Sequence, residues 1–218
     1  MDLLSILQQR YSTKAYDSSK KIPQAQFEEL LALIRLTPSS INIQPWHFMI
    51  AVEQSAKQRI AESLIGNYAY NASKVLDSSH TLVFCSKTDI DETYLQQLNN
   101  QENLDGRFKD LVSQQQRHQS LQNYVQHYHQ SQGDISRWTE NQTFIALGQL
   151  LTTAALKGID ATPIGGFNAE ILSQQLKLDT LGLKPSVIVA LGYRSDSDFN
   201  AKLPKSRLDE SEIFSYIA

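Results

Sequence analysis

Two short segments near opposite ends of the sequence combine cations with hydroxyl groups. Residues 10–14 read RYSTK, and residues 204–207 read PKSR. If the first segment is extended, Arg10, Ser12 and Lys14 lie on one side of it, because side chains alternate along an extended chain. A guanidinium, a hydroxyl and an ammonium presented together are suited to bind a phosphate group and the polar edge of a ring. These segments are therefore the first candidates for a ligand site.

A third polar segment lies between Pro38 and Pro45. Residues 38–48 read PSSINIQPWHF, so hydroxyl and amide side chains fill a turn that leads directly into an apolar run. A turn with a purely structural function does not need so many hydrogen-bonding side chains before a strand. The segment is therefore a second candidate for ligand contact.

Several common kinds of active site have no counterpart in the sequence. The GxGxxG, GxxxxGK[ST], GxSxG, HExxH and CxxC patterns are all absent. His127 and His129 point apart if they lie on a helix, so we expect no shared metal. His47 and His80 fall at strand edges and are expected to be structural, and Cys85 is expected to pack as a small hydrophobe. An enzyme with this sequence would leave the difficult chemistry to a cofactor.

Composition limits the class of protein. The chain has 218 residues, 41% of them hydrophobic, with 20 basic against 23 acidic residues and a formal net charge of −3. This balance excludes a strongly basic nucleic-acid binder, and no apolar run approaches the length of a membrane span. The N-terminal order of charges does not match a secretory signal. We expect one domain over residues 1–218, in the cytoplasm, with no nucleic-acid or membrane partner.

Periodicity predicts an α+β fold in which helices outnumber strands about two to one. Helices are expected to begin at Asp2 and at Pro23, and to cover residues 54–65, 134–157 (Asp134 starting the longest) and 168–176. Strands are expected over residues 46–52, 81–85, 159–164 and 186–193. Of these, 46–52 is interpreted as a buried strand, and 186–193 is expected to follow Pro185.

Three segments are less determined. The glutamine-rich residues 89–132 form either a disordered tract or, as we favour, a helical excursion, because Leu121, Tyr124, Val125 and Tyr128 keep helical spacing. The apolar half of the 134–157 helix lies either at the centre of a large core or against a partner chain. The polar tail from residue 198 ends in an apolar cluster, which we expect to dock on another surface.

Six segments in order resemble the nitroreductase family, in particular its bacterial oxygen-insensitive NAD(P)H nitroreductases, also known as dihydropteridine reductases. They are RYSTK at 10–14, PSSINIQPWHF at 38–48, Asn71 with Lys74, DGRF at 105–108, PIGGF at 163–167 and LPKSR at 203–207. The resemblance covers essentially the whole chain. It implies a homodimer whose subunits have a small central sheet flanked by helices. It also implies a C-terminal segment exchanged between subunits and one FMN per subunit at the interface.

The resemblance also assigns residues. Arg10, Ser12, Lys205 and Arg207 would hold the FMN phosphate and ribityl chain, and Lys14, Asn71 and Lys74 would lie at the pyrimidine edge. The other subunit would supply Pro38, Ser39, Ser40 and Asn42. Pro163, Ile164, Gly165 and Gly166 would line the ring, and Tyr11, Thr13 and Ser206, within the two basic motifs, would also bind the cofactor. Ser40, Ile41 and Tyr124 would contact the substrate. No catalytic side chain and no metal are expected.

The chain departs from the family pattern at four of these positions. Gly165 stands where relatives often carry glutamate, and Tyr11 where a histidine is frequent. Ile41 replaces a smaller polar residue, which should make the pocket more apolar, and Tyr124 keeps an aromatic ring with an added hydroxyl.

The implied activity is a ping-pong, two-electron oxidoreductase with NADH or NADPH as co-substrate. Its acceptors would be nitroaromatics, quinones, flavins or dihydropterin. Two alternatives stay open: flavin-cleaving or dehalogenating chemistry on the same fold, and a non-catalytic flavin-binding protein.

Overall fold

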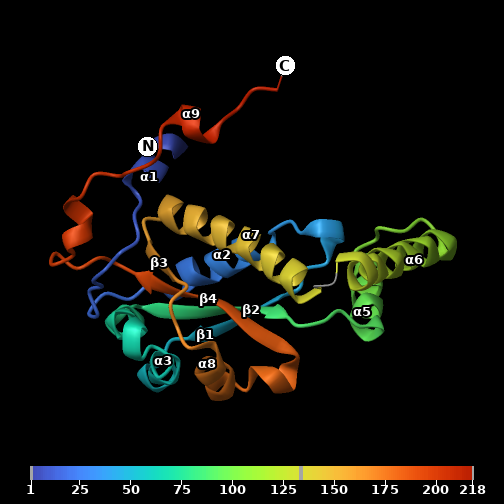
Figure 1. Ribbon diagram of the computed structural model, residues 1–218, viewed down its shortest axis with the longest axis horizontal. Coiled ribbons are helices and arrows are strands. Elements are labelled where there is room, and N and C mark those ends of the chain that lie inside the picture. Colours follow the sequence, from blue (N-terminus) through green and yellow to red (C-terminus); the bar gives the residue numbers. More distant parts are fainter. Residues whose placement is uncertain (1, 133–134, 218) are drawn as a thin grey trace.

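The computed structural model describes residues 2–132 and 135–217, and a four-stranded antiparallel sheet lies at the centre of this part of the chain (Figure 1). The strand order is β1-β2-β4-β3. The strands are β1 (Trp46–Ala51), β2 (His80–Lys87), β3 (Asp160–Ile164) and β4 (Leu183–Gly192). The predicted α+β class, with a small sheet flanked by helices, is confirmed.

The central strands β2 and β4 are buried on both faces. Leu82 and Phe84 of β2 pack into a core cluster on one side of the sheet, while Val83 and Cys85 pack into a second cluster on the other. Side chains of β4 alternate in the same way. Cys85 is fully buried, which confirms its predicted packing as a hydrophobe.

The prediction of a buried strand over residues 46–52 is wrong in one respect. β1 occupies almost that range, but it is an edge strand of the described sheet and pairs only with β2. His47 is exposed, and Ile50 is 43% exposed. An apolar run does not reveal whether a strand has one neighbour or two. At the edge of this sheet, part of the surface of β1 stays exposed to solvent.

Helices α2 (Gln24–Arg35) and α7 (Ile135–Leu156) cover one face of the sheet (Figure 1). Their shared core includes Phe27, Leu30 and Ile34 of α2, which fall on one helical face as their spacing predicts. Gly158, with φ of 68°, follows the last turn of α7. The predicted start at Asp134 lies outside the described residues.

The opposite face carries α3 (Gln54–Ala61), α4 (Ala72–Asp77) and α8 (Ala169–Leu176). The Asn168 side chain caps α8 by accepting from the Ile171 amide at 2.9 Å, as predicted. The helix expected over 54–65 ends four residues early. There the Ser63 and Leu64 amides donate to the carbonyls of Ile60 and Ala61, which tightens the turn.

Most of residues 89–132 is helical, so the disordered alternative is wrong. Helices α5 (Glu92–Leu104) and α6 (Leu111–His127) project from the end of the sheet as a separate pair (Figure 1). Asp91 and Asp110 cap them, and a third core cluster joins Leu95, Leu121 and Trp138.

Short elements complete the described chain. They are α1 (Leu3–Gln9), η1 (Ser40–Asn42), η2 (Gly66–Asn71), η3 (Tyr128–Gln132), η4 (Leu178–Leu181), η5 (Phe199–Lys202) and α9 (Glu210–Ile213). Asp2 caps α1 as predicted, its side chain accepting from the Ser5 amide. After η5 the chain passes α1 and then runs away from the body (Figure 1). Among the described residues, no helix combines the length and apolar character needed to cross a membrane.

Candidate functional site

The two basic segments meet beside α1. Arg10 directly follows that helix, and with Lys205 and Arg207 it lines a polar cavity of about 290 Å³. The Lys205 ammonium donates to the Arg10 carbonyl, so the C-terminal segment is bound to the end of α1. The same cavity contains the other predicted members Tyr11, Ser12 and Ser206.

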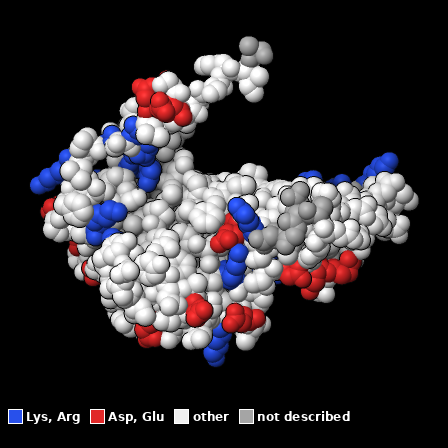
Figure 2. Space-filling model, in the orientation of Figure 1, with Lys and Arg blue, Asp and Glu red and all other residues white. Residues whose placement is uncertain are grey.

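This cavity is strongly cationic. None of its described lining residues is acidic, and Figure 2 shows Lys and Arg atoms gathered beside α1, below the acidic atoms of α9. Burial and the charge of Arg207 lower the pKa of Arg10. Burial, then Arg10 and Arg207, lower the pKa of Lys205. Three cations that repel one another in an open cavity are suited to bind a multiply charged anion.

Asp198, which sequence reasoning missed, fixes the geometry of this cavity. Its carboxylate is 1% exposed and accepts from the Lys14 amide at 2.9 Å and from the Tyr11 hydroxyl at 3.2 Å. Its other oxygen accepts from the Asn200 amide, and the Asn200 side chain donates to the Ser12 carbonyl at 2.9 Å. The two basic segments are therefore joined by buried polar contacts. The only signal in the sequence was a helix-capping residue in a polar tail.

A second group of predicted residues lies near the end of β3. Lys74 is 6% exposed, and its ammonium donates to Asn71 Oδ1 at 2.7 Å and to the Tyr70 carbonyl at 2.9 Å. Asn71 Nδ2 donates to the Gly166 carbonyl at 3.2 Å. Burial, then the charge of Lys14, lowers the pKa of Lys74. Lys74 is thus an inward-facing cation paired with Asn71, rather than a solvated lysine on a helix.

The two glycines that follow β3 have different surroundings. A Cβ at Gly166 would lie 2.8 Å from a ring carbon of Tyr68, whereas nothing lies within 4 Å of a Cβ at Gly165. The Ile164 side chain packs in the core, so only its backbone faces the candidate site. The Thr13 hydroxyl is buried and has no hydrogen-bond partner among the described residues.

The 38–42 turn does not join these two groups within one chain. The Ser40 amide donates to Gln142 Oε1 at 2.8 Å, near the start of α7. Arg10 instead shares a cavity with Ala155, near the end of α7. At about 1.5 Å of rise per residue, Gln142 and Ala155 lie about 20 Å apart. Figure 1 likewise shows the turn and α1 at opposite ends of α7.

Polar contacts inside the subunit hold the turn itself. Ser39 Oγ accepts from the Gln44 amide at 2.9 Å, and Asn42 Nδ2 donates to Glu102 Oε1 at 3.2 Å. The hydroxyls of Ser40 and Tyr124 lie 3.2 Å apart, so two of the three predicted substrate contacts are neighbours. The third, Ile41, lies between Ser40 and Asn42.

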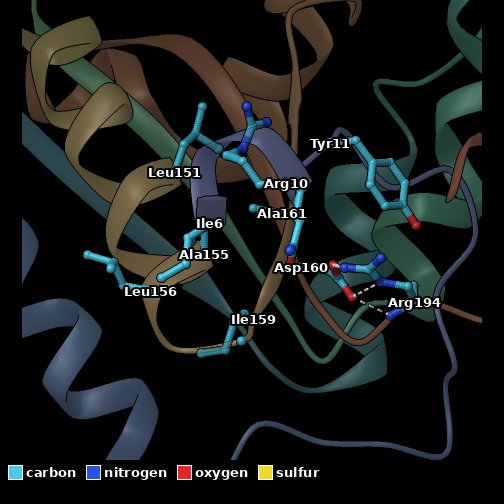
Figure 3. A pocket seen from close by; sticks show the side chains of 12 residues that line it. Ile6, Arg10, Tyr11, Leu151, Ala155, Leu156, Ile159, Asp160, Ala161 and Arg194 are labelled. Carbon is cyan, nitrogen blue, oxygen red and sulfur yellow. Dashed lines mark hydrogen bonds and ion pairs between the residues drawn. The ribbon is translucent and has the colours of Figure 1, made fainter. Parts of the chain in front are cut away.

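A second cavity, of about 320 Å³, adjoins the cationic one and shares Arg10 and Tyr11 with it. Figure 3 shows Arg194 turned toward Asp160, beside apolar residues of α1 and α7. The backbone amide, Nε and Nη2 of Arg194 donate to the Asp160 carboxylate at 2.8, 3.0 and 2.6 Å. Its guanidinium lies 4.8 Å from the Tyr11 ring centre, and burial is the main cause that raises the pKa of Tyr11 to about 12. The ion pair with Asp160 therefore holds the Arg194 guanidinium against the ring of Tyr11.

Comparisons with known proteins agree with the resemblance in the six segments. A model described as "Nitroreductase family" matches residues 7–193. The chain is 40% identical to an oxygen-insensitive NAD(P)H nitroreductase of Salmonella typhimurium, over 95% of this chain and 96% of that protein. It is 33% identical to the major NAD(P)H-flavin oxidoreductase of Aliivibrio fischeri, over 92% of each. A protein of Exiguobacterium sibiricum solved in complex with FMN matches the fold with a TM-score of 0.82, at 22% identity over 100% of this chain and 98% of that one.

Proposed function

The chain belongs to the nitroreductase family, and on that premise we propose that it is an FMN-holding NAD(P)H oxidoreductase that reduces small-molecule acceptors. The observation that carries the proposal is the separation of two cationic groups. Arg10, Lys205 and Arg207 line one open cavity, while Lys14 and Lys74 lie near each other beside Asn71. A ligand with a phosphate at one end and an electron-accepting ring at the other fits this arrangement.

The residues present fit FMN. The cationic cavity has the donors that a phosphate needs, and the buried Lys74 beside Asn71 supplies a cation for the polar edge of the ring. When bound, FMN supplies hydride acceptance from NAD(P)H and two-electron transfer to an acceptor. Lys14 and Lys74 would stabilise negative charge at the ring edge. Gly165 offers its backbone amide without the carboxylate that relatives often have there.

A second copy of the chain would complete the site. Within one chain, the 38–42 turn lies about 20 Å along α7 from the cationic cavity. On the outer side of α7, Phe144 and Ile145 are about half exposed, and Tyr216 and Ile217 in the tail are fully exposed. Exposed large apolar side chains on these two segments are what a partner surface would cover. A homodimer with exchanged C-terminal segments would cover it and bring Pro38, Ser39, Ser40 and Asn42 to the partner's FMN.

The oligomeric part of the proposal is tested by removing residues 211–218. The truncated chain should aggregate or elute as a monomer that retains little FMN, because the docking segment is gone. Size-exclusion chromatography with absorbance at flavin wavelengths measures both properties. A truncated chain that remains a dimer with full FMN content would contradict the exchange.

The acceptor side of the site would consist of Ser40, Ile41 and Tyr124. Two hydroxyls 3.2 Å apart beside an aliphatic side chain suit a planar molecule with an oxygen at its edge. Nitroaromatics, quinones, flavins and quinonoid dihydropterin all have this chemistry.

Anaerobic addition of NADH or NADPH to the FMN-loaded protein tests the proposed activity. The flavin absorbance should bleach within the mixing time of a manual assay and return when an acceptor is added. A panel of the four acceptor classes then ranks them by kcat/KM. A protein that binds FMN but does not bleach is a flavin-binding protein without this activity. Loss of the FMN ring system under oxygen would instead indicate flavin-cleaving chemistry.

A further inference from the structure

The turn that carries the acceptor-side residues has an unusual backbone. Ile41, Asn42 and Gln44 have φ values of 48°, 59° and 47°. The left-handed region is sterically unfavourable for side chains other than glycine, and most of all for a β-branched residue such as isoleucine. Such a conformation persists only where surrounding contacts determine it.

Those contacts come from the α5–α6 pair. Arg117 Nη2, on α6, donates to the Ile41 carbonyl at 2.7 Å. The same guanidinium donates to both oxygens of Glu102, on α5, at 2.9 and 3.0 Å. Glu102 also accepts from Asn42 Nδ2, so one carboxylate and one guanidinium hold two successive left-handed residues.

The surroundings of Glu102 make this arrangement stiff. Its side chain is 5% exposed, and that of Arg117 is 26% exposed. Burial by itself would raise the pKa of Glu102, but hydrogen bonds from Arg117 and Asn42 and the charges of Arg117 and Arg107 lower it overall. A planar guanidinium can bind a carboxylate and a carbonyl at once, which an ammonium cannot match. The Tyr94 hydroxyl of α5 shares its one hydrogen between the Ile43 and Gln44 carbonyls, at 2.9 and 2.7 Å.

We propose that Glu102 and Arg117 are positioning residues that hold Ile41 in its left-handed conformation and thereby set the acceptor side of the site. The glutamine-rich α5–α6 pair then has a function, which is to hold the conformation of the turn. The consequence for acceptors rests on the proposed function, but the mechanical coupling between Arg117 and Ile41 does not.

A double-mutant cycle tests the coupling. Arg117→Lys keeps the positive charge opposite Glu102 but loses the hydrogen bond to the Ile41 carbonyl. Ile41→Gly removes the steric penalty of the left-handed conformation, which that hydrogen bond offsets. With equal FMN occupancy, Arg117→Lys should lower kcat/KM for a quinone acceptor about tenfold in the Ile41 chain, as expected for one charged hydrogen bond. In the Ile41→Gly chain the loss should be less than about twofold.

The matched control is Arg107→Lys. Arg107 approaches the same carboxylate at 3.9 Å with a 63% exposed side chain, and within the described part of the chain its side chain has no hydrogen bond to the turn. It should leave kcat/KM within about twofold of the parent. A loss as large as that of Arg117→Lys would mean that charge at Glu102, rather than the hold on Ile41, controls the site.

The second readout needs neither FMN nor activity. Urea unfolding of the four FMN-free chains should show that Arg117→Lys raises the equilibrium constant of unfolding about fivefold less in the Ile41 chain than in the Ile41→Gly chain. The freed Ile41 turn can relax and recover its strain energy of about 1 kcal/mol, whereas the glycine turn has no strain to recover. Equal losses in both chains, in unfolding and in kcat/KM, would overturn the proposal and make Arg117 an ordinary support of the helix pair. If the protein failed to react with NAD(P)H, the proposed function would fall, while the unfolding cycle would still decide the coupling.

Discussion

Replacement of Arg207 by alanine should separate phosphate recognition from folding. The Arg207 guanidinium donates to the adjacent Ser206 carbonyl at 2.5 Å, so its removal breaks a contact within its own turn. It also removes a positive charge that lowers the pKa of both Arg10 and Lys205. The FMN-free protein should therefore be as stable as the parent or slightly more stable, because repulsion in the cavity decreases.

FMN binding should weaken at the same time. A hydrogen bond to a charged group contributes about 1.5–3 kcal/mol. Arg207 is exposed and partly screened by solvent, so we take the lower end, about 1.5 kcal/mol, which corresponds to roughly a tenfold higher Kd. Riboflavin has the same ring without the phosphate, and its affinity should not change.

Quenching of flavin fluorescence on titration with FMN-free protein measures both ligands. Titration at low and high salt should show a weaker salt dependence in Arg207→Ala than in the parent. Lys202→Ala is the matched control, since Lys202 is an exposed cation on η5 outside the cationic cavity. An unchanged Kd for FMN, or an equal loss for riboflavin, would refute the assignment of this cavity to the phosphate.

Three further predictions address other parts of the molecule. Asp198→Ala should lower the unfolding free energy by about 1–3 kcal/mol in urea, because it leaves the Lys14 amide and Tyr11 hydroxyl without an acceptor, whereas exposed Asp196→Ala should have little effect. Lys14→Met should lower the two-electron potential of bound FMN by roughly 20–45 mV in a redox titration, and an unchanged potential would remove Lys14 from the ring edge. Burial, then Lys57 and Lys21, lowers the pKa of His80, so the unfolded chain protonates first and stability should fall as pH drops below about 6.5. His80→Gln should flatten that dependence.

Local patterns predicted the central elements well, because the physics that forms them is local. The apolar runs of β2 and β4 and the 3.6-residue periodicity of α2 need no knowledge of their neighbours. The two basic segments were also visible locally, but solvated basic turns are common, and it was the resemblance of six segments in order that gave these cations a role.

Other features depended on contacts that the sequence does not display. β4 begins at Leu183 and runs through Pro185, although proline interrupts most strands. The register of β2 shifts between Phe84 and Cys85, opposite that proline, and such an irregularity accommodates a residue without an amide hydrogen. The burial of Asp198 and the hold of Arg117 on Ile41 are likewise tertiary, because each joins segments distant in the chain.

The hydrogen bonds between Asp198 and the 10–14 segment have a consequence for biosynthesis. Tyr11 and Asp198 are separated by 187 positions, so the first side of the cationic cavity leaves the ribosome long before the second. At 5–20 residues per second the interval is roughly 10–40 s. During that time Arg10 has no Lys205 or Arg207 beside it. In the sheet, β3 pairs with β4 alone, and β2 has only β1 as a neighbour until β4 has been made. Cofactor loading is therefore a late event, and nascent chains should compete poorly for scarce FMN against finished ones.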